Sequence, residues 1–346
     1  MKMKSTLKKY QGLSLVELMV ALAVGLFLVA GVLQIYLGSR QSFLVQESLS
    51  RLQENGRFAL MFMEEDIRMA DYRGCGTRSA RVPLNNVLVS NTNYLWNFAV
   101  GIEGYEAISA SSWNSTPDSS INSPMGGRDI LTVRRASPET YKVVTHAIGT
   151  DSVELNSGAA IETGDVVMTA SCESAAVFVV TNESSGSLEH DASDDGDTKT
   201  PDNSTNDLGT GYANADIFRL DTVTYYIRNS GFTGRPSLYR KVGNSDAQEL
   251  IQDVEDMQIT YGEDTNTDAL VDRYVSASAV SDWNNVISVN INLLLVTPED
   301  NLTPTLNPQP YVFNGVNYDG VSGPLPGDNR LRQAFTSTTT LRNRTL

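Results

Sequence analysis

The sequence predicts an α+β protein in which one long N-terminal helix packs on an antiparallel β-sheet domain with long loops. An uncharged apolar stretch covers residues 18–39, and an amphipathic helical pattern continues from it to about residue 70. The remaining chain is divided into short segments rich in Val, Ile and Thr, which are typical of strands. With 346 residues, the chain is long enough to bury a hydrophobic core beside such a helix.

The apolar stretch has the length of a transmembrane helix. At a rise of about 1.5 Å per residue, residues 18–39 would extend about 33 Å, and the hydrocarbon core of a bilayer is about 30 Å thick. Residues 1–12 contain four lysines and no acid: Lys2, Lys4, Lys8 and Lys9. The positive-inside rule therefore places the N-terminus in the cytoplasm and the bulk of the chain outside. Because more helix follows the stretch, we expect a retained anchor and not an ordinary secretory signal.

Beyond the membrane the helical pattern becomes amphipathic. Apolar residues recur at steps of about three and four, with charged residues between them; they include Leu44, Leu49, Leu52, Phe58, Met61, Phe62 and Ile67. Gly74 and Gly76 provide the stop signal. One helix over residues 13–70 would be about 87 Å long, with its first half in the membrane and its second half on the globular domain.

The start of the apolar stretch carries a specific motif. The basic segment ends in Gly12-Leu13-Ser14-Leu15-Val16-Glu17-Leu18. Basic residues, a glycine, a small hydroxyl residue, an aliphatic pair, a glutamate and some twenty apolar residues resemble the type IV pilin signature. The resemblance implies that residues 1–12 are a leader, that a prepilin peptidase cuts between Gly12 and Leu13, and that Leu13 is then N-methylated. The family usually has Phe at the first mature position, and Leu13 departs from that.

Glu17 has two interpretations. A carboxylate at the edge of an apolar span is costly unless it stays at the interface or finds a partner. Taken alone, it fits an acid at a helix N-terminus, where the helix dipole favours it. The pilin resemblance instead implies an assembly role, in which Glu17 pairs with the methylated amino terminus of a neighbouring subunit in the helical core of a pilus.

Other segments resemble the PilW-type minor pilins in particular. They are residues 51–58, residues 66–75, the order of strands over residues 221–296, and the ending Leu341-Arg342-Asn343-Arg344. The resemblance implies a minor pilin that takes part in initiating pilus assembly, at or near the filament tip. It implies an inner-membrane protein with a periplasmic bulk that later enters the extracellular pilus, and a connection with twitching motility and cell adhesion. The implied partners are other minor pilins, the major pilin, the prepilin peptidase, the inner-membrane assembly machinery and a tip adhesin.

Two related functions stay open. A minor pseudopilin of a type II secretion system would share the leader and the strand order. A pilus-associated adhesin would use the loops at residues 84–126 and 183–216 as its binding surface. An enzyme is not expected, because the sequence has no nucleophile elbow, phosphate loop, HExxH or paired-cysteine metal motif.

The net charge and the histidine content also argue against nucleic-acid binding and against catalysis. The net charge of −15, which would become −19 without residues 1–12, argues against a nucleic-acid-binding surface. The two histidines, His146 and His190, are interpreted as surface or strand residues without a catalytic role.

The exported region, residues 71–346, reads as β-structure with polar connections. The clearest strand is 285–296, where apolar residues alternate with Ser and Asn. Further strands are predicted at 129–135, 141–147, 152–155, 165–170, 175–181, 221–228, 237–242 and 257–261. A helical turn is predicted at 248–254, irregular loops with short strands at 84–126, and a long flexible acidic loop at 183–216.

The two cysteines, Cys75 and Cys172, are predicted to form a disulfide if the domain is exported. Closing a loop of that length would stabilise the fold by roughly 4–5 kcal/mol in the chain-entropy model. The alternative is two buried thiols. The spacing does not fit a zinc finger.

Oxygen-bearing side chains alternate at Asp264, Asn266 and Asp268, and Asp272 follows. This pattern resembles the start of a calcium loop, in which such ligands converge on one hard cation. The sixth loop position is Ala269 where that loop has Gly, and the twelfth lacks the closing Glu. A weak calcium site and a polar turn between strands both fit the pattern, and no other cofactor is expected.

Overall fold

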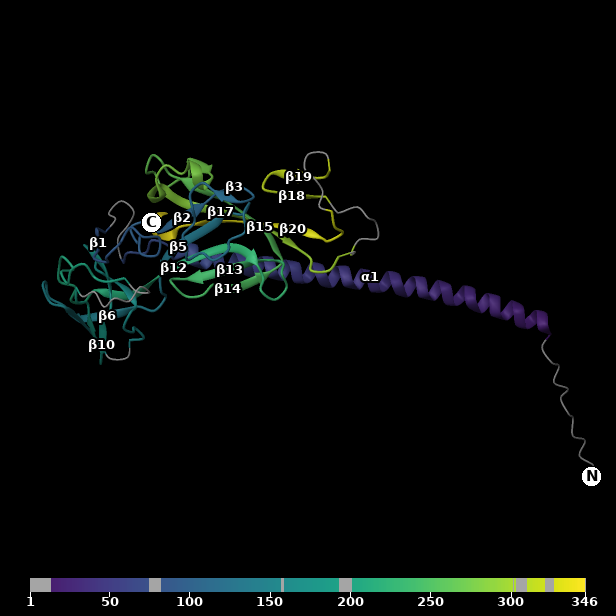
Figure 1. Ribbon diagram of the computed structural model, residues 1–346, viewed down its shortest axis with the longest axis horizontal. Helices are drawn as coiled ribbons and strands as arrows, with labels where there is room; N and C mark the ends of the chain where they lie inside the picture. Colours follow the sequence, from purple (N-terminus) through teal and green to yellow (C-terminus); the bar gives the residue numbers. More distant parts are fainter. Residues whose placement is uncertain are drawn as a thin grey trace, which may run out of the picture.

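The computed structural model describes residues 14–74, 82–156, 159–192, 201–300, 302, 310–320 and 327–345. One helix, α1 (Leu15–Arg68), extends as a rod from a β-rich domain (Figure 1). The predicted α+β fold, with a long N-terminal helix and a largely antiparallel sheet domain, is confirmed. The predicted first helical residue, Leu13, lies outside the described residues.

The second half of α1 is the part that packs on the domain. Its buried residues, at steps of three and four, are Ser48, Leu52, Gly56, Ala59, Met63, Asp66 and Ile67. They form one stripe along the helix, and this stripe packs against the strands β20, β17, β14 and β5, whose bounds are given below. The sequence pattern therefore predicted correctly which half of the helix has a partner within the subunit.

A four-stranded antiparallel sheet lies along this half of α1. Its order is β16 (Arg273–Val275), β15 (Val254–Glu263), β17 (Val286–Val296) and β20 (Arg332–Thr340). The register sets Ile259 of β15 opposite Ile291 of β17, and Ile291 opposite Ser337 of β20. The predicted strand 285–296 is β17. Strand β20 was not predicted.

A second sheet is built around the long strand β12 (Asp216–Asn229), which joins the two ends of the domain. Residues at the start of β12 pair with β8 (Val166–Ala170) and β6 (Tyr141–Thr145), and later residues pair with β5 (Ile130–Ala136) and β13 (Pro236–Val242). The outer strands are β1 (Leu84–Asn86), β2 (Ile102–Tyr105), β7 (Ser152–Leu155), β9 (Ala175–Val179), β10 (Asn182–Ser184), β11 (Ser187–Glu189) and β14 (Gln248–Gln252).

The short elements complete the chain. They are β3 (Ala107–Ser109), β4 (Ser112–Trp113), η2 (Ala277–Ala279), η3 (Trp283–Asn285), β18 (Tyr311–Phe313), β19 (Val316–Tyr318) and α2 (Arg342–Thr345). The strand pairs β3–β4 and β18–β19 form two small antiparallel hairpins.

The described buried residues form several clusters, and two of them, here called the helix lobe and the distal lobe, share β12. The helix lobe contains the α1 stripe together with Tyr225 and the inward residues of β15 and β17. The distal lobe contains Phe178, Leu188, Tyr212 and Ile217, and is built from β6, β7, β9 and β11 with residues 201–215. Figure 1 shows β6 and β10 at the end of the domain that lies away from the exposed half of α1.

Two predictions about connections were wrong. Residues 248–252 form strand β14, paired with β13, where a helical turn was predicted. Gln, Glu and Leu favour a helix locally, but pairing with a neighbouring strand overrides that preference.

The range predicted as a flexible acidic loop, 183–216, contains the hairpin β10–β11 and several buried side chains. Leu188, Leu208 and Tyr212 are among them and belong to the core of the distal lobe. Residues 193–200 lie outside the described residues.

Candidate assembly site

The described chain begins with a capping box at the N-terminus of α1. The backbone N–H of Glu17 donates to Ser14 Oγ (3.2 Å), and the backbone N–H of Ser14 donates to Glu17 Oε2 (2.9 Å). These bonds satisfy donors that a helix end leaves without an intrahelical acceptor. In the single chain, Glu17 therefore stabilises the start of its own helix, and its pairing with another subunit stays a prediction. Gly12 and Leu13 lie outside the described residues.

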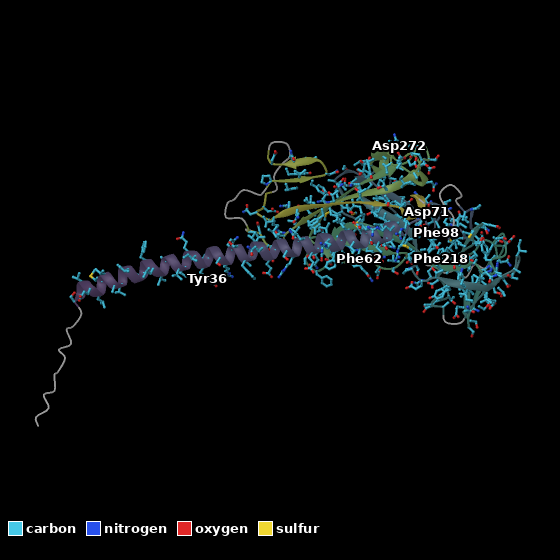
Figure 2. The ribbon with its side chains drawn as sticks, turned by 180° about the vertical axis from the view of Figure 1, so that it is seen from behind. Tyr36, Phe62, Asp71, Phe98, Phe218 and Asp272 are labelled. Atoms are coloured by element: carbon cyan, nitrogen blue, oxygen red, sulfur yellow. The ribbon has the colours of Figure 1, made fainter. Side chains whose placement is uncertain are left out.

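The first half of α1 is apolar and has no partner among the described residues. Its most apolar window has the length and composition of a membrane span, and none of it is buried. Phe27 is 81 % exposed, and Tyr36 stands on the rod well outside the domain (Figure 2). Exposing such a surface to water costs about 25 cal/mol per Å² of apolar area. This half therefore requires lipid or other apolar helices around it.

A glycine lets the second half of α1 approach β20 closely. A Cβ on Gly56 would lie 2.6 Å from ring carbons of Phe335, closer than real atoms approach. Two turns along the helix, Ser337 Oγ donates to Glu64 Oε1. Gly56 costs helix propensity of about 1 kcal/mol relative to Ala, and it makes room for the aromatic ring of the neighbouring strand.

A buried carboxylate fixes α1 on the domain. Asp66 is 4 % exposed and lies 3.1 Å from Arg240 Nε and 2.9 Å from Arg135 Nε. The Tyr225 hydroxyl donates to Asp66 Oδ2 (2.5 Å). Burial, and then the Asp66 charge, raise the pKa of Tyr225 well above its ordinary value, so the phenol keeps its proton and donates. Two cations and one donor thus compensate the buried charge from three different strands.

The C-terminal motif closes over the end of α1. Arg344 Nε lies 2.7 Å from Asp71 Oδ2, and Arg344 Nη1 donates to the carbonyl oxygens of Trp283 (2.5 Å) and Val286 (2.8 Å). The side-chain amide of Asn343 donates to the carbonyl of the residue before Asp71 (2.8 Å). Figure 2 places Asp71 at the domain end of the helix. The ending noticed in the sequence therefore ties the last residues of the chain to the helix terminus.

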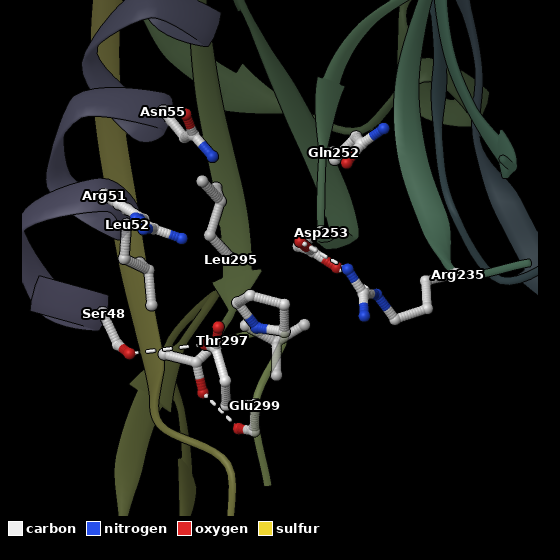
Figure 3. Close-up of a pocket in the computed structure, with 12 residues that line it drawn as sticks. Ser48, Arg51, Leu52, Asn55, Arg235, Gln252, Asp253, Leu295, Thr297 and Glu299 are labelled. Atoms are coloured by element: carbon white, nitrogen blue, oxygen red, sulfur yellow. Dashed lines mark hydrogen bonds and ion pairs between the residues drawn. The ribbon is translucent and has the colours of Figure 1, made fainter. Parts of the chain in front are cut away.

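A cavity of about 360 Å³ lies where α1 leaves the domain, between the helix and the ends of β14 and β17 (Figure 3). Its wall carries the ion pair of Arg235 and Asp253, with two contacts of 2.6 and 3.2 Å. On the helix side, Arg51 pairs with a glutamate one turn before it, and Ser48 contacts Glu299. These charged groups of the cavity already have partners within the subunit.

Two family models match the chain. The model for the type IV pilus-assembly protein W matches residues 224–343, and the model for the prokaryotic N-terminal methylation motif matches residues 7–33. Over these residues the chain is similar to the PilW family of pilus-assembly proteins. The first matched range runs from within β12 through β20 to Asn343 of the closing motif, so this family segment is largely the sheet of the helix lobe. No curated protein matches the chain.

These findings place this pilin in the inner membrane, with its N-terminal apolar helix as anchor and its β-rich domain in the periplasm. They also make it a pilin related to the type IV pilus, and therefore associated with other pilus components. The domains of this family are structural.

The predicted disulfide of this pilin involves one residue outside the described part, Cys75. Its partner Cys172 lies in the turn between β8 and β9. A Cβ on Gly74 would lie 3.1 Å from Ala170 Cβ and 3.5 Å from Ser171 O, so the chain approaches Cys172 just before it reaches Cys75. This approach is compatible with the bridge, which stays a prediction.

The predicted calcium residues of the pilin lie in one loop between β15 and β16. Asp264 accepts backbone N–H bonds from Asn266, Thr267 and Ala269. Asn266 Nδ2 donates to both Asp268 Oδ2 and Asp272 Oδ1, each at 3.2 Å.

Hydrogen bonds from Thr265 lower the pKa of Asp272 below its ordinary value. The structure thus brings the four predicted side chains together, but in a hydrogen-bonded turn. Across the described ranges, no group of three or more His, Cys, Asp or Glu residues is placed to hold a metal ion. Calcium binding stays a prediction.

The histidines of the pilin were expected at surface or strand positions, and the surface alternative is wrong. His146 is 7 % exposed and His190 is fully buried, and they directly follow the strands β6 and β11. Their rings lie side by side in the distal lobe, with centroids 5.7 Å apart. His190 lies two residues after the buried Leu188, as strand alternation requires, but histidine is a polar residue and was not counted in the apolar pattern.

Proposed function

We propose that this pilin is a minor pilin that helps to initiate assembly of the type IV pilus, and that it lies at or near the filament tip with other minor pilins. The observation that carries the proposal is the division of α1. Its first half is apolar and exposed, and its second half is fixed to a bulky two-lobed domain by Asp66 and by the C-terminal closure. A domain of this size limits how many copies can pack side by side, which suits a position with few neighbours.

The processing steps belong to the same proposal. A prepilin peptidase would cut between Gly12 and Leu13, methylate Leu13 and release a chain whose mature helix starts at the capping box. Glu17 would then pair with the amino terminus of a neighbouring pilin. In an apolar helical core a carboxylate needs a cationic partner, and a methylated amine supplies one without polar side chains.

The test is deletion of the gene, with surface pili and type II secretion scored separately. The proposal expects pili to be lost or much reduced while secretion is normal, and both to be normal after complementation. Loss of secretion with normal piliation would identify a pseudopilin of the secretion system. Normal piliation with loss of surface attachment would identify an adhesin.

The position in the filament has its own test. An epitope tag in the distal lobe, away from α1, should be found by immunogold labelling at one end of sheared filaments. Labelling along the whole filament length would contradict a tip position. Crosslinking from the exposed half of α1 would identify the neighbouring pilins.

A further inference from the structure

The distal lobe contains a pair of buried imidazoles that are not used in the assembly site. His190 is fully buried against Phe178, with ring centroids 5.0 Å apart, and against His146, at 5.7 Å. His146 in turn lies 5.8 Å from the ring of Tyr212. The pair is thus enclosed by aromatic groups that come from separate segments of the chain.

Three of the four ring nitrogens have no hydrogen-bond partner in the described part of the chain: His146 Nε2, His190 Nδ1 and His190 Nε2. The fourth, His146 Nδ1, accepts the backbone N–H of Tyr212 at 3.1 Å. A nitrogen that accepts this bond carries no proton, so the folded lobe holds His146 neutral. Adding a proton to either ring would put a cation in an apolar site beside a second imidazole.

Few charged groups face the pair. Asp151, just before β7, is the acid whose charge acts on His190, and its carbonyl accepts the backbone N–H of His190 (2.8 Å). Phe178 on β9 is apolar, and Tyr212 in the segment 201–215 is a phenol. Burial, and then the neighbouring His146, lower the pKa of His190 to about 4, and burial lowers the pKa of His146.

The pair helps to hold down a particular segment, residues 201–215, which supplies buried side chains to the distal lobe. Near the start of the segment, Asn203 exchanges two hydrogen bonds of 2.8 Å with the backbone of Val179. Near its end, the backbone N–H of Tyr212 is bound by His146 Nδ1. Protonation of His146 removes the acceptor near the end and leaves the attachment at the start intact.

We propose that His146 and His190 form an acid-sensitive latch: protonation of the pair releases the Tyr212 end of residues 201–215 and loosens the distal lobe, while the helix lobe stays folded. The sign follows from linkage. The unfolded or released state binds protons with an ordinary histidine pKa near 6.5, whereas in the folded state the pKa of His190 is about 4 and that of His146 is lowered by burial. The latch is therefore fully closed above about pH 6.5 and weakens as the pH falls toward about 4. In the periplasm and outside the cell, the pH of the medium would operate it.

The test is hydrogen–deuterium exchange of the full mature protein in detergent micelles at about pH 7 and about pH 4.5, corrected for intrinsic exchange rates. Peptides covering 208–217 should exchange roughly tenfold faster or more at the lower pH, whereas peptides covering 52–67 of α1 should not change. The double variant His146→Asn/His190→Phe keeps an acceptor for Tyr212 and an aromatic ring on Phe178 but does not titrate. It should lose the acid response.

A matched control uses a buried acid of the helix lobe. Burial raises the pKa of Asp129 to about 6, and its carboxylate accepts the N–H groups of Ala107 and Ile259. The variant Asp129→Asn removes a titration in the same pH range but leaves the latch, so the response of 208–217 should be unchanged. Equal protection of this segment at both pH values, or a response that persists in the histidine double variant, would overturn the proposal.

A second measurement does not depend on any variant. The chain has two histidines, so NMR of labelled histidine rings reports on the pair alone, and a nitrogen label on tyrosine adds the backbone amide of Tyr212. We expect both rings to titrate far below pH 6.5. The amide signal of Tyr212 should shift over the same pH range as the ring of His146. Two rings that titrate near pH 6.5 without moving the Tyr212 amide would contradict the latch.

Discussion

At the residue scale, Glu17 caps its own helix and is predicted to pair with another subunit, and the two roles need different properties of its side chain. The capping box needs an acceptor at this position, which a glutamine also provides. Pairing with the amino terminus of another subunit needs a negative charge, which a glutamine lacks.

The variants Glu17→Gln and Glu17→Ala therefore separate the two roles. Membrane insertion should stay intact in both, because each removes a charge from the edge of an apolar span. If the charge pairs between subunits, both variants should be depleted from sheared filaments to a similar degree. Incorporation of Glu17→Gln at the wild-type level, measured by immunoblot of filament and membrane fractions, would leave only the capping role.

The predicted disulfide would join the segment after α1 to the turn between β8 and β9. Non-reducing peptide mapping of the exported protein should find Cys75 and Cys172 in one linked peptide pair. Cys172→Ser should then cost about 2–5 kcal/mol in the free energy of unfolding. Alkylation of both thiols in the folded protein without a reductant would contradict the bridge.

A test of the loop from Asp264 to Asp272 needs a variant that removes a calcium ligand without breaking the hydrogen bonds of the turn. Asp264 accepts three backbone N–H bonds, so Asp264→Ala should destabilise the loop with or without calcium. Asp268 is exposed and is the cleaner choice. If the loop binds calcium with a weak extracellular affinity of about 10⁻⁴–10⁻³ M, millimolar calcium should raise the Tm of the wild type and not that of Asp268→Ala. An equal response of both proteins would leave only a polar turn.

At the scale of elements, the contact of α1 with β20 depends on the missing side chain at Gly56. Gly56→Ala should gain up to about 1 kcal/mol of helix propensity but lose about 1–3 kcal/mol through the clash with Phe335, for a net loss of stability. Phe335→Leu in the same background should recover part of it, because the smaller side chain leaves room for the new methyl group. Denaturant unfolding of the full protein in micelles measures both. A stabilised Gly56→Ala single variant would show that β20 does not press on the helix.

Sequence periodicity predicted the elements that have one buried face. α1 and β17 repeat apolar residues at helical and strand spacing, and both were found within about two residues of their ends. Strand β20 was missed because its run of Thr and Ser residues gives no apolar alternation. The buried histidines were missed for a related reason: His190 is enclosed by Phe178 and His146, which come from distant segments. Contacts of that kind depend on topology, which one sequence does not encode as a local pattern.

At the scale of the whole molecule, the two ends of the globular domain meet. Asp71 follows α1, Arg344 lies near the end of the chain, and their paired side chains are 2 % and 4 % exposed. Arg344→Ala removes one of two arginines that contact the buried Asp71, the other being Arg73 at 3.0 Å, together with the hydrogen bonds to Trp283 and Val286. It should therefore cost about 1.5–3 kcal/mol in the free energy of unfolding. Arg342→Ala, at an exposed arginine of the same motif, is the matched control and should change stability by less than about 0.5 kcal/mol. If the two variants melt at the same temperature, the pairing of Asp71 with Arg344 does not stabilise the domain.

The closure at Asp71 and Arg344 also determines how the molecule would respond to a pulling force. Tension on a filament would enter this chain through α1, which runs without a break from the exposed half into the helix lobe. There the helix lies along β20 and β17, and the last residues of the chain hold its far end. A force along the helix axis must therefore break many contacts between α1 and the strands at the same time. It cannot break them one after another from a free end of the chain. The helix lobe would therefore unfold only at a high force, and the distal lobe would carry little of the tension.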